Sequence, residues 1–127
     1  MTKRPLSITI LAWVYIAVGA AGFAYHLTDF RASEAFRYDG IWIELVRLLA
    51  VLAGAFMLRG HNWARWLALA WMALHVIVSA FHSLPECAIH GLFCAIIAWL
   101  LFRPPAARYF RQATGTEVRE GDWHHRP

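Results

Sequence analysis

The stretch LSITILAWVYIAVGAAGFAYHL, residues 6–27, decides the fold class of this chain. It contains no Asp, Glu, Lys or Arg. A bilayer core of about 30 Å needs roughly 17 to 25 apolar residues in a helix that rises about 1.5 Å per residue. The stretch is therefore long and apolar enough to cross a membrane as one helix.

Three further apolar stretches follow, at residues 41–58, 63–83 and 86–102. The composition agrees, because 60% of the residues are hydrophobic and 16% are charged, against roughly 45 to 50% and about 25% in soluble domains. The sequence predicts an all-α integral membrane protein, a four-helix bundle with spans at about 6–27, 41–58, 63–83 and 86–102. We therefore expect the lipid bilayer to be a partner of this chain.

Basic residues flank one side of the predicted bundle: Lys3, Arg4, Arg59, Arg65, Arg103, Arg108 and Arg111. The loop on the other side has Arg31 and Arg37 together with three acidic residues. Because Lys and Arg stay on the cytoplasmic side of short loops, we expect an N-in, C-in topology. The opening residues 4–9 are typical of small bacterial membrane proteins, so a bacterial inner (plasma) membrane is the expected location.

A cleaved signal peptide is the alternative interpretation of the first stretch. It has a basic start, an apolar run and the small residues Gly19-Ala20-Ala21-Gly22. Cleavage would leave three spans, but the apolar run is longer than a typical signal core. A retained span is favoured.

The outer loop and the tail carry weaker patterns. In the loop at residues 28–40, Phe30, Ser33 and Phe36 recur near helical spacing, which predicts a short interfacial helix. The tail, residues 104–127, begins with two prolines and continues with mixed charges. We expect a dispensable cytoplasmic segment with a short surface helix followed by disorder.

Polar side chains within the spans share one depth, in the half near the predicted outer side: His26, Glu44, Arg47, His75, His82, Glu86 and His90. Ionisable groups in lipid are costly, so each needs a partner in the bundle interior. The sequence therefore predicts one outward-facing His/Glu/Arg pocket. Trp71 lies deeper than the aromatic residues at the span ends, where it could line a cavity, but filling the bundle or facing lipid is the expected role.

Imidazole and carboxylate groups suit a transition metal ion or haem. His26 or His75 with His90 is the expected haem or cofactor pair, and His82, Glu86 and His90 are the expected metal set. The sequence has no H-E-x-x-H or C-x-x-C motif, so polar packing remains open as the role of these histidines.

Two other polar pairs have local explanations. Glu44 and Arg47, three residues apart on one helix, form an ion pair that locks that helix. The alternatives are that Glu44 handles protons or that Arg47 binds an anion. Ser83 and Glu86 have the spacing of a helix-capping box, which is by itself a sufficient reason for Glu86.

The sequence also limits the function classes. Basic residues are scattered singly despite a net charge of +4, which argues against nucleic-acid binding. No nucleophile with a base and no nucleotide loop is recognised, so an enzyme is unsupported. We expect a pocket that binds a metal ion, haem or another small ligand. The alternatives are an accessory subunit of a larger membrane complex and a proton-coupled carrier that acts as a homo-oligomer.

Overall fold

A computed structural model describes residues 3–30 and 38–121. Its five helices are α1 (Leu6–Phe30), α2 (Tyr38–Leu58), α3 (Asn62–Ala80), α4 (Leu84–Phe102) and α5 (Pro104–Gly121). Four of them, α1 to α4, are long and apolar enough to cross a membrane. The chain is therefore all-helical, as predicted, with the four expected apolar helices.

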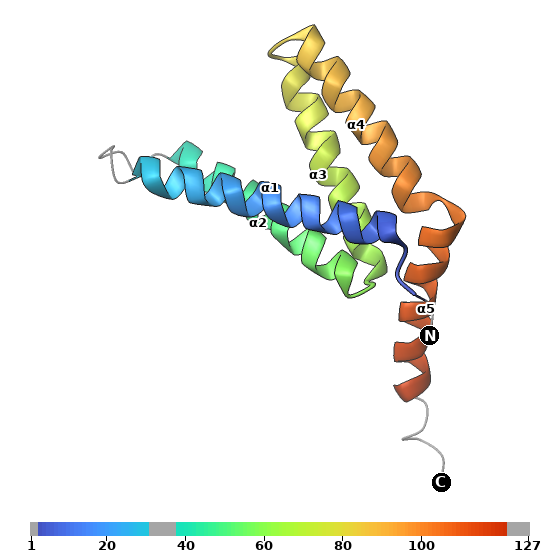
Figure 1. The fold of residues 1–127 in the computed structure, drawn as a ribbon. Coiled ribbons are helices and arrows are strands. Elements are labelled where there is room, and N and C mark those ends of the chain that lie inside the picture. Colours follow the sequence, from blue (N-terminus) through green and yellow to red (C-terminus); the bar gives the residue numbers. More distant parts are fainter. Residues whose placement is uncertain (1–2, 31–37, 122–127) are drawn as a thin grey trace.

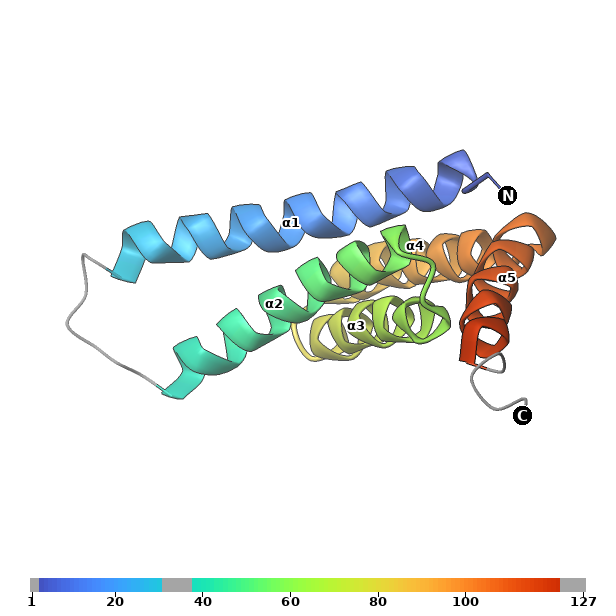
Figure 2. The same ribbon diagram turned by 90° about the horizontal axis from the view of Figure 1, so that it is seen from below.

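The four apolar helices form two hairpins, α1–α2 and α3–α4 (Figure 1). The hairpins meet at the end that holds the α2–α3 turn, the start of α1 and α5, and they diverge toward their other ends (Figures 1 and 2). Following the predicted topology, we call the first end inner and the second end outer. The divergence separates polar side chains that the sequence predicts to converge.

Small residues allow α1 and α2 to approach closely. A Cβ atom on Gly54 would lie 2.5 Å from the carbonyl oxygen of Ala12, and one on Gly19 would lie 2.6 Å from Cγ2 of Val51. Contacts this short leave no space for a side chain. Packing of backbone against backbone at small residues is the usual way in which helices associate inside membranes.

Two aromatic side chains connect the hairpins. The hydroxyl of Tyr15 on α1 donates to the carbonyl oxygen of Ala68 on α3 at 2.7 Å. The indole Nε1 of Trp71 on α3 donates to the carbonyl oxygen of Val46 on α2, also at 2.7 Å. The two rings contact each other with centroids 5.3 Å apart. Because a polar donor in an apolar interior needs an acceptor, these bonds define where the hairpins meet.

Helix α5 packs against the inner end of the bundle. Ala106 and Phe110 are fully buried, and the hydroxyl of Tyr109 donates to the carbonyl oxygen of Leu58 at 3.0 Å. Arg4 Nη1 donates to the same carbonyl at 2.8 Å. The tail therefore contains a helix, but it is longer than the short surface helix that the sequence predicts, with 18 residues to Gly121, and it contributes to the core. Residues 122–127 lie outside the described part of the chain.

The hairpin turns shift two of the predicted span boundaries. Ser83 is extended, with φ −159° and ψ 144°, and its side chain accepts a hydrogen bond from the Glu86 N–H at 3.3 Å. This cap starts α4 at Leu84, so the expected N-cap interaction is present, and α3 ends at Ala80 with Phe81 as its C-cap. Most of the predicted interfacial helix, at residues 31–37, lies outside the described residues.

Apolar side chains cover the outside of the hairpins. Only 11% of the span window of α4 and 28% of that of α1 are buried within the chain. Phe81 and Leu84 at the outer turn are 87% and 83% exposed. Water is a poor solvent for such a surface, which is consistent with a multi-pass membrane protein.

Candidate functional site

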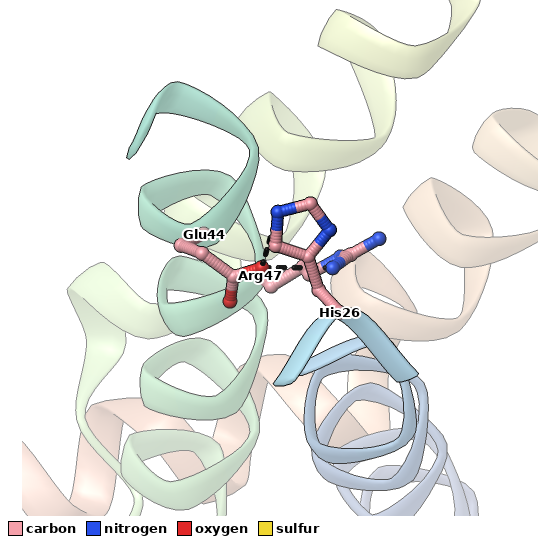
Figure 3. A network of polar contacts seen from close by, with 3 residues as sticks. All are labelled: His26, Glu44 and Arg47. Carbon is pink, nitrogen blue, oxygen red and sulfur yellow. Dashed lines mark hydrogen bonds and ion pairs between the residues drawn. The ribbon is translucent and has the colours of Figure 1, made fainter. Parts of the chain in front are cut away.

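Three polar side chains meet between the outer halves of α1 and α2 (Figure 3). Arg47 Nη1 donates to Glu44 Oε1 at 2.9 Å. His26 Nε2, from α1, lies 3.9 Å from the same oxygen. The expected ion pair of α2 is therefore present, and a histidine approaches it from the neighbouring helix.

Gly22 makes room for the Arg47 side chain, because a Cβ atom on Gly22 would lie 2.9 Å from Arg47 Nε. A Cβ atom on Gly40 would lie 3.5 Å from His26 Nε2, which is an ordinary contact distance. The second carboxylate oxygen, Glu44 Oε2, is buried and has no hydrogen-bond partner among the described residues. A buried carboxylate oxygen without a hydrogen-bond partner is costly, so this oxygen marks a position that a hydrogen-bond donor could fill.

A second polar group joins α3 to α4. His90 Nδ1 lies 2.8 Å from Ser79 Oγ, and Ser79 is buried. The rings of His75 and His90 are neighbours, with centroids 6.1 Å apart and an interplanar angle of 39°. The structure therefore places these two histidines together, on the α3–α4 hairpin.

Hydrogen bonds identify which nitrogen of three imidazoles is available. In His75, His82 and His90, Nδ1 lies 2.9, 3.1 and 2.9 Å from the carbonyl oxygen of the residue four positions earlier. Because a carbonyl oxygen only accepts, a neutral His75 or His82 ring that makes this bond carries its hydrogen on Nδ1 and its lone pair on Nε2. Nδ1 of His90 also contacts the Ser79 hydroxyl, which can donate or accept. Nε2 is the atom that can accept a proton, a hydrogen bond from a ligand, or a metal ion.

The structure does not gather the metal set predicted from the sequence. His82 and Glu86 are exposed at the α3–α4 turn, whereas His90 turns toward Ser79. In the described residues, no three His, Cys, Asp or Glu side chains are grouped so that they could hold a metal ion. Of the predicted cofactor pairs, His75 and His90 are adjacent, while His26 lies with Glu44 on the other hairpin.

Two cavities lie where the hairpins diverge, and they share Trp71 and His75 as lining residues. The first, the α2–α3 cavity, has a volume of about 330 Å³ and is lined by Trp42, Ile43, Val46, Arg47, Trp71, Leu74, His75 and Val78. The second, the α1–α4 cavity, has a volume of about 400 Å³ and is lined by Val14, Tyr15, Val18, Trp71, Met72, His75, His90, Phe93 and Ile97. Both linings are mainly apolar, with Arg47 and His75 in the first and His75 and His90 in the second as ionisable side chains that could anchor a ligand.

Trp71 is the residue that the sequence interpretation undervalued. Its ring contacts the His75 ring at a tilt of 38°, with centroids 4.0 Å apart. Its Nε1 donates to the Val46 carbonyl oxygen, and it lines both cavities. The spacing of four residues between Trp71 and His75 places the two on one helix face, and this was the available signal.

Comparison with known proteins does not assign the chain to a family. No protein-family model matches it, and neither a curated protein nor a solved structure matches it. The side chains and cavities described above define its class: an all-helical protein with four candidate membrane spans and histidine-lined cavities between two hairpins.

Proposed function

We propose that this protein is a membrane protein that binds a small organic ligand in the cavities between its two hairpins, with His75 as the polar anchor. This proposal rests on the observation that the imidazole of His75 lines both cavities. Its Nδ1 is bonded to the Trp71 carbonyl oxygen, and its Nε2 is not hydrogen-bonded within the described residues. The N-in, C-in topology remains a prediction, and the proposed function assumes it.

The lining supports a ligand with a flat or chain-like apolar body and one polar group. Cavities of roughly 300 to 1,000 Å³ with apolar walls and few polar groups are typical of small-molecule sites. Trp42 and Trp71 supply aromatic surface in the α2–α3 cavity, and Arg47 and His75 are its polar lining residues. A hydroxyl or acidic group on the ligand would donate to His75 Nε2, which has a lone pair to accept it.

The experiment is a chemical analysis of the full chain purified in a mild detergent. An organic extract is examined by mass spectrometry, and the same sample is used for an absorption spectrum and for metal analysis. We expect an organic molecule, distinct from bulk lipid and detergent, at close to one per chain.

Two matched variants sharpen the test. His75→Phe removes Nε2 and adds bulk to both cavities, so the affinity should fall about tenfold, the effect of losing about 1.4 kcal/mol of binding free energy, and less ligand should copurify. His82→Phe changes an exposed histidine outside the lining and should leave the occupancy unchanged. The purified chain could instead show a haem absorption band or contain one metal ion per chain. If that signal disappears in His75→Phe, the proposal of a small organic ligand is wrong. An extract without any such molecule would also overturn the proposal.

The group of His26, Glu44 and Arg47 favours a second candidate, a proton-coupled carrier. Glu44 has one oxygen bonded to Arg47 and one buried oxygen without a partner among the described residues, so protonation would change its interactions with both neighbours. In liposomes, Glu44→Gln should then abolish proton-driven uptake of the ligand found above while leaving binding in place. Uptake that continues in Glu44→Gln would refute this candidate.

A further inference from the structure

A third cavity lies at the inner end, away from the candidate ligand site, and its lining is basic. It has a volume of about 380 Å³ and is lined by Lys3, Pro5, Pro105, Arg108, Tyr109 and Gln112. These residues come from the segment before α1 and from α5, which lie side by side (Figure 1). The lining has two basic side chains and no acidic one.

The two basic side chains of this inner cavity are available for a ligand. Neither Lys3 nor Arg108 is hydrogen-bonded or ion-paired to another residue in the described part of the chain, and both are exposed. Other basic residues nearby are engaged: Arg4 bonds to Thr9 and to the Leu58 carbonyl oxygen, and Arg103 bonds to Ser7. Among the described side chains, the cavity thus has two positive charges without a paired anion, which favour an anionic ligand.

The position of the inner cavity indicates where the anion comes from. Its residues directly precede α1 and follow α4, so they lie just beyond the ends of two apolar helices. Trp63, Trp66 and Trp99 at the same end are 49%, 55% and 64% exposed, and exposed tryptophans mark the level of lipid headgroups. Lipid phosphates occupy that level in a bilayer.

We propose that the inner cavity binds a phosphate group, supplied by the headgroup of an anionic lipid. Lys3 and Arg108 provide the charge, Gln112 provides an amide, and the Tyr109 ring forms one wall while its hydroxyl stays bonded to α2. Such a contact would tie the start of α1 and helix α5 to the membrane surface. The site is independent of the ligand cavities between the hairpins.

The test measures binding of short-chain phosphatidylglycerol to the full chain in detergent micelles at about 150 mM salt, where the screening length of about 8 Å suppresses distant charges. Short-chain phosphatidylcholine, whose phosphate is neutralised by choline, and inorganic phosphate are titrated in parallel. We expect saturable binding of phosphatidylglycerol and much weaker binding of phosphatidylcholine.

Two double variants with equal loss of charge separate a site from general attraction. Lys3→Gln/Arg108→Gln should weaken phosphatidylglycerol binding about 25-fold, since each cation near an anionic lipid contributes about a factor of five. Arg59→Gln/Arg111→Gln removes two exposed charges outside the lining and should change binding less than about threefold.

Each remaining outcome overturns part or all of the proposal. Equal weakening in both double variants would show unspecific attraction, and equal binding of the two lipids would show that anionic charge is not recognised. If inorganic phosphate binds with the same dependence on Lys3 and Arg108 while the lipid does not, the ligand is a dissolved phosphate and the lipid assignment is wrong. If no phosphate compound binds, the site does not exist.

Discussion

Replacing Gly54 by alanine would test the close approach of α1 and α2. The added Cβ would lie 2.5 Å from the Ala12 carbonyl oxygen and 2.7 Å from Ile16 Cγ1, whereas ordinary contact begins at 3.4 Å. Because the first obstacle is backbone, the helices must move apart. Overpacking of this kind costs about 1 to 3 kcal/mol, offset by about 0.5 to 1 kcal/mol of gain in helix propensity.

Gly91 on α4 provides the matched control, because a Cβ atom there would meet nothing within 4 Å. Gly91→Ala makes the same gain in helix propensity without the clash. The free energy of unfolding should therefore differ by about 1 to 3 kcal/mol between the two variants, with Gly54→Ala the less stable. Titration of the detergent-solubilised chain with dodecyl sulfate, followed by far-ultraviolet circular dichroism, measures both values. A difference below about 0.5 kcal/mol would refute the described packing.

Three further substitutions should lower the free energy of unfolding in the same assay. Tyr15→Phe removes the hydrogen bond to Ala68 and should cost about 0.6 to 1.5 kcal/mol; no change would mean that this bond does not join the hairpins. Ser83→Ala removes the N-cap of α4 and should cost about 1 kcal/mol, which Ser83→Asp restores; a loss that Asp does not restore would contradict capping. Phe110→Ala empties a fully buried position and should cost about 3 to 5 kcal/mol. As a control, Arg111→Ala at the exposed neighbouring position should cost less than about 0.5 kcal/mol. Equal effects of the two substitutions would contradict the packing of α5.

Local rules were sufficient for the helices themselves. The apolar runs predict α1 to α4 because spanning length and composition are properties of each segment alone. The bond between Arg47 and Glu44 and the cap at Ser83 follow from spacings of three residues. These features need no knowledge of how the hairpins sit relative to each other.

The arrangement of the histidines could not be read in the same way. Depth along a helix and position on its face place His26 and His75 at the same level, but they do not specify the angle between two hairpins. Divergence of the hairpins leaves His26 beside Glu44 and His75 beside His90. The predicted single pocket assumed parallel helices, and that assumption is a tertiary property.

Helix α5 carried a local signal that the sequence interpretation passed over. Ala106, Tyr109, Phe110 and Ala113 recur at intervals of three and four residues, as expected for one apolar helix face. Ala106 and Phe110 are fully buried. The two prolines at its start were interpreted as the beginning of an irregular tail, although proline is well tolerated in a first helical turn.

The two carbonyl bonds donated by Tyr15 and Trp71 also act as a fulcrum. His26 lies eleven residues beyond Tyr15 on α1, a lever arm of about 16 Å at about 1.5 Å per residue. A turn of α1–α2 by about 10° around that point would displace His26 by about 3 Å, while side chains beside the fulcrum would hardly move. Small turns would therefore change the outer parts of the two cavities more than the space beside His75, without unpacking either hairpin.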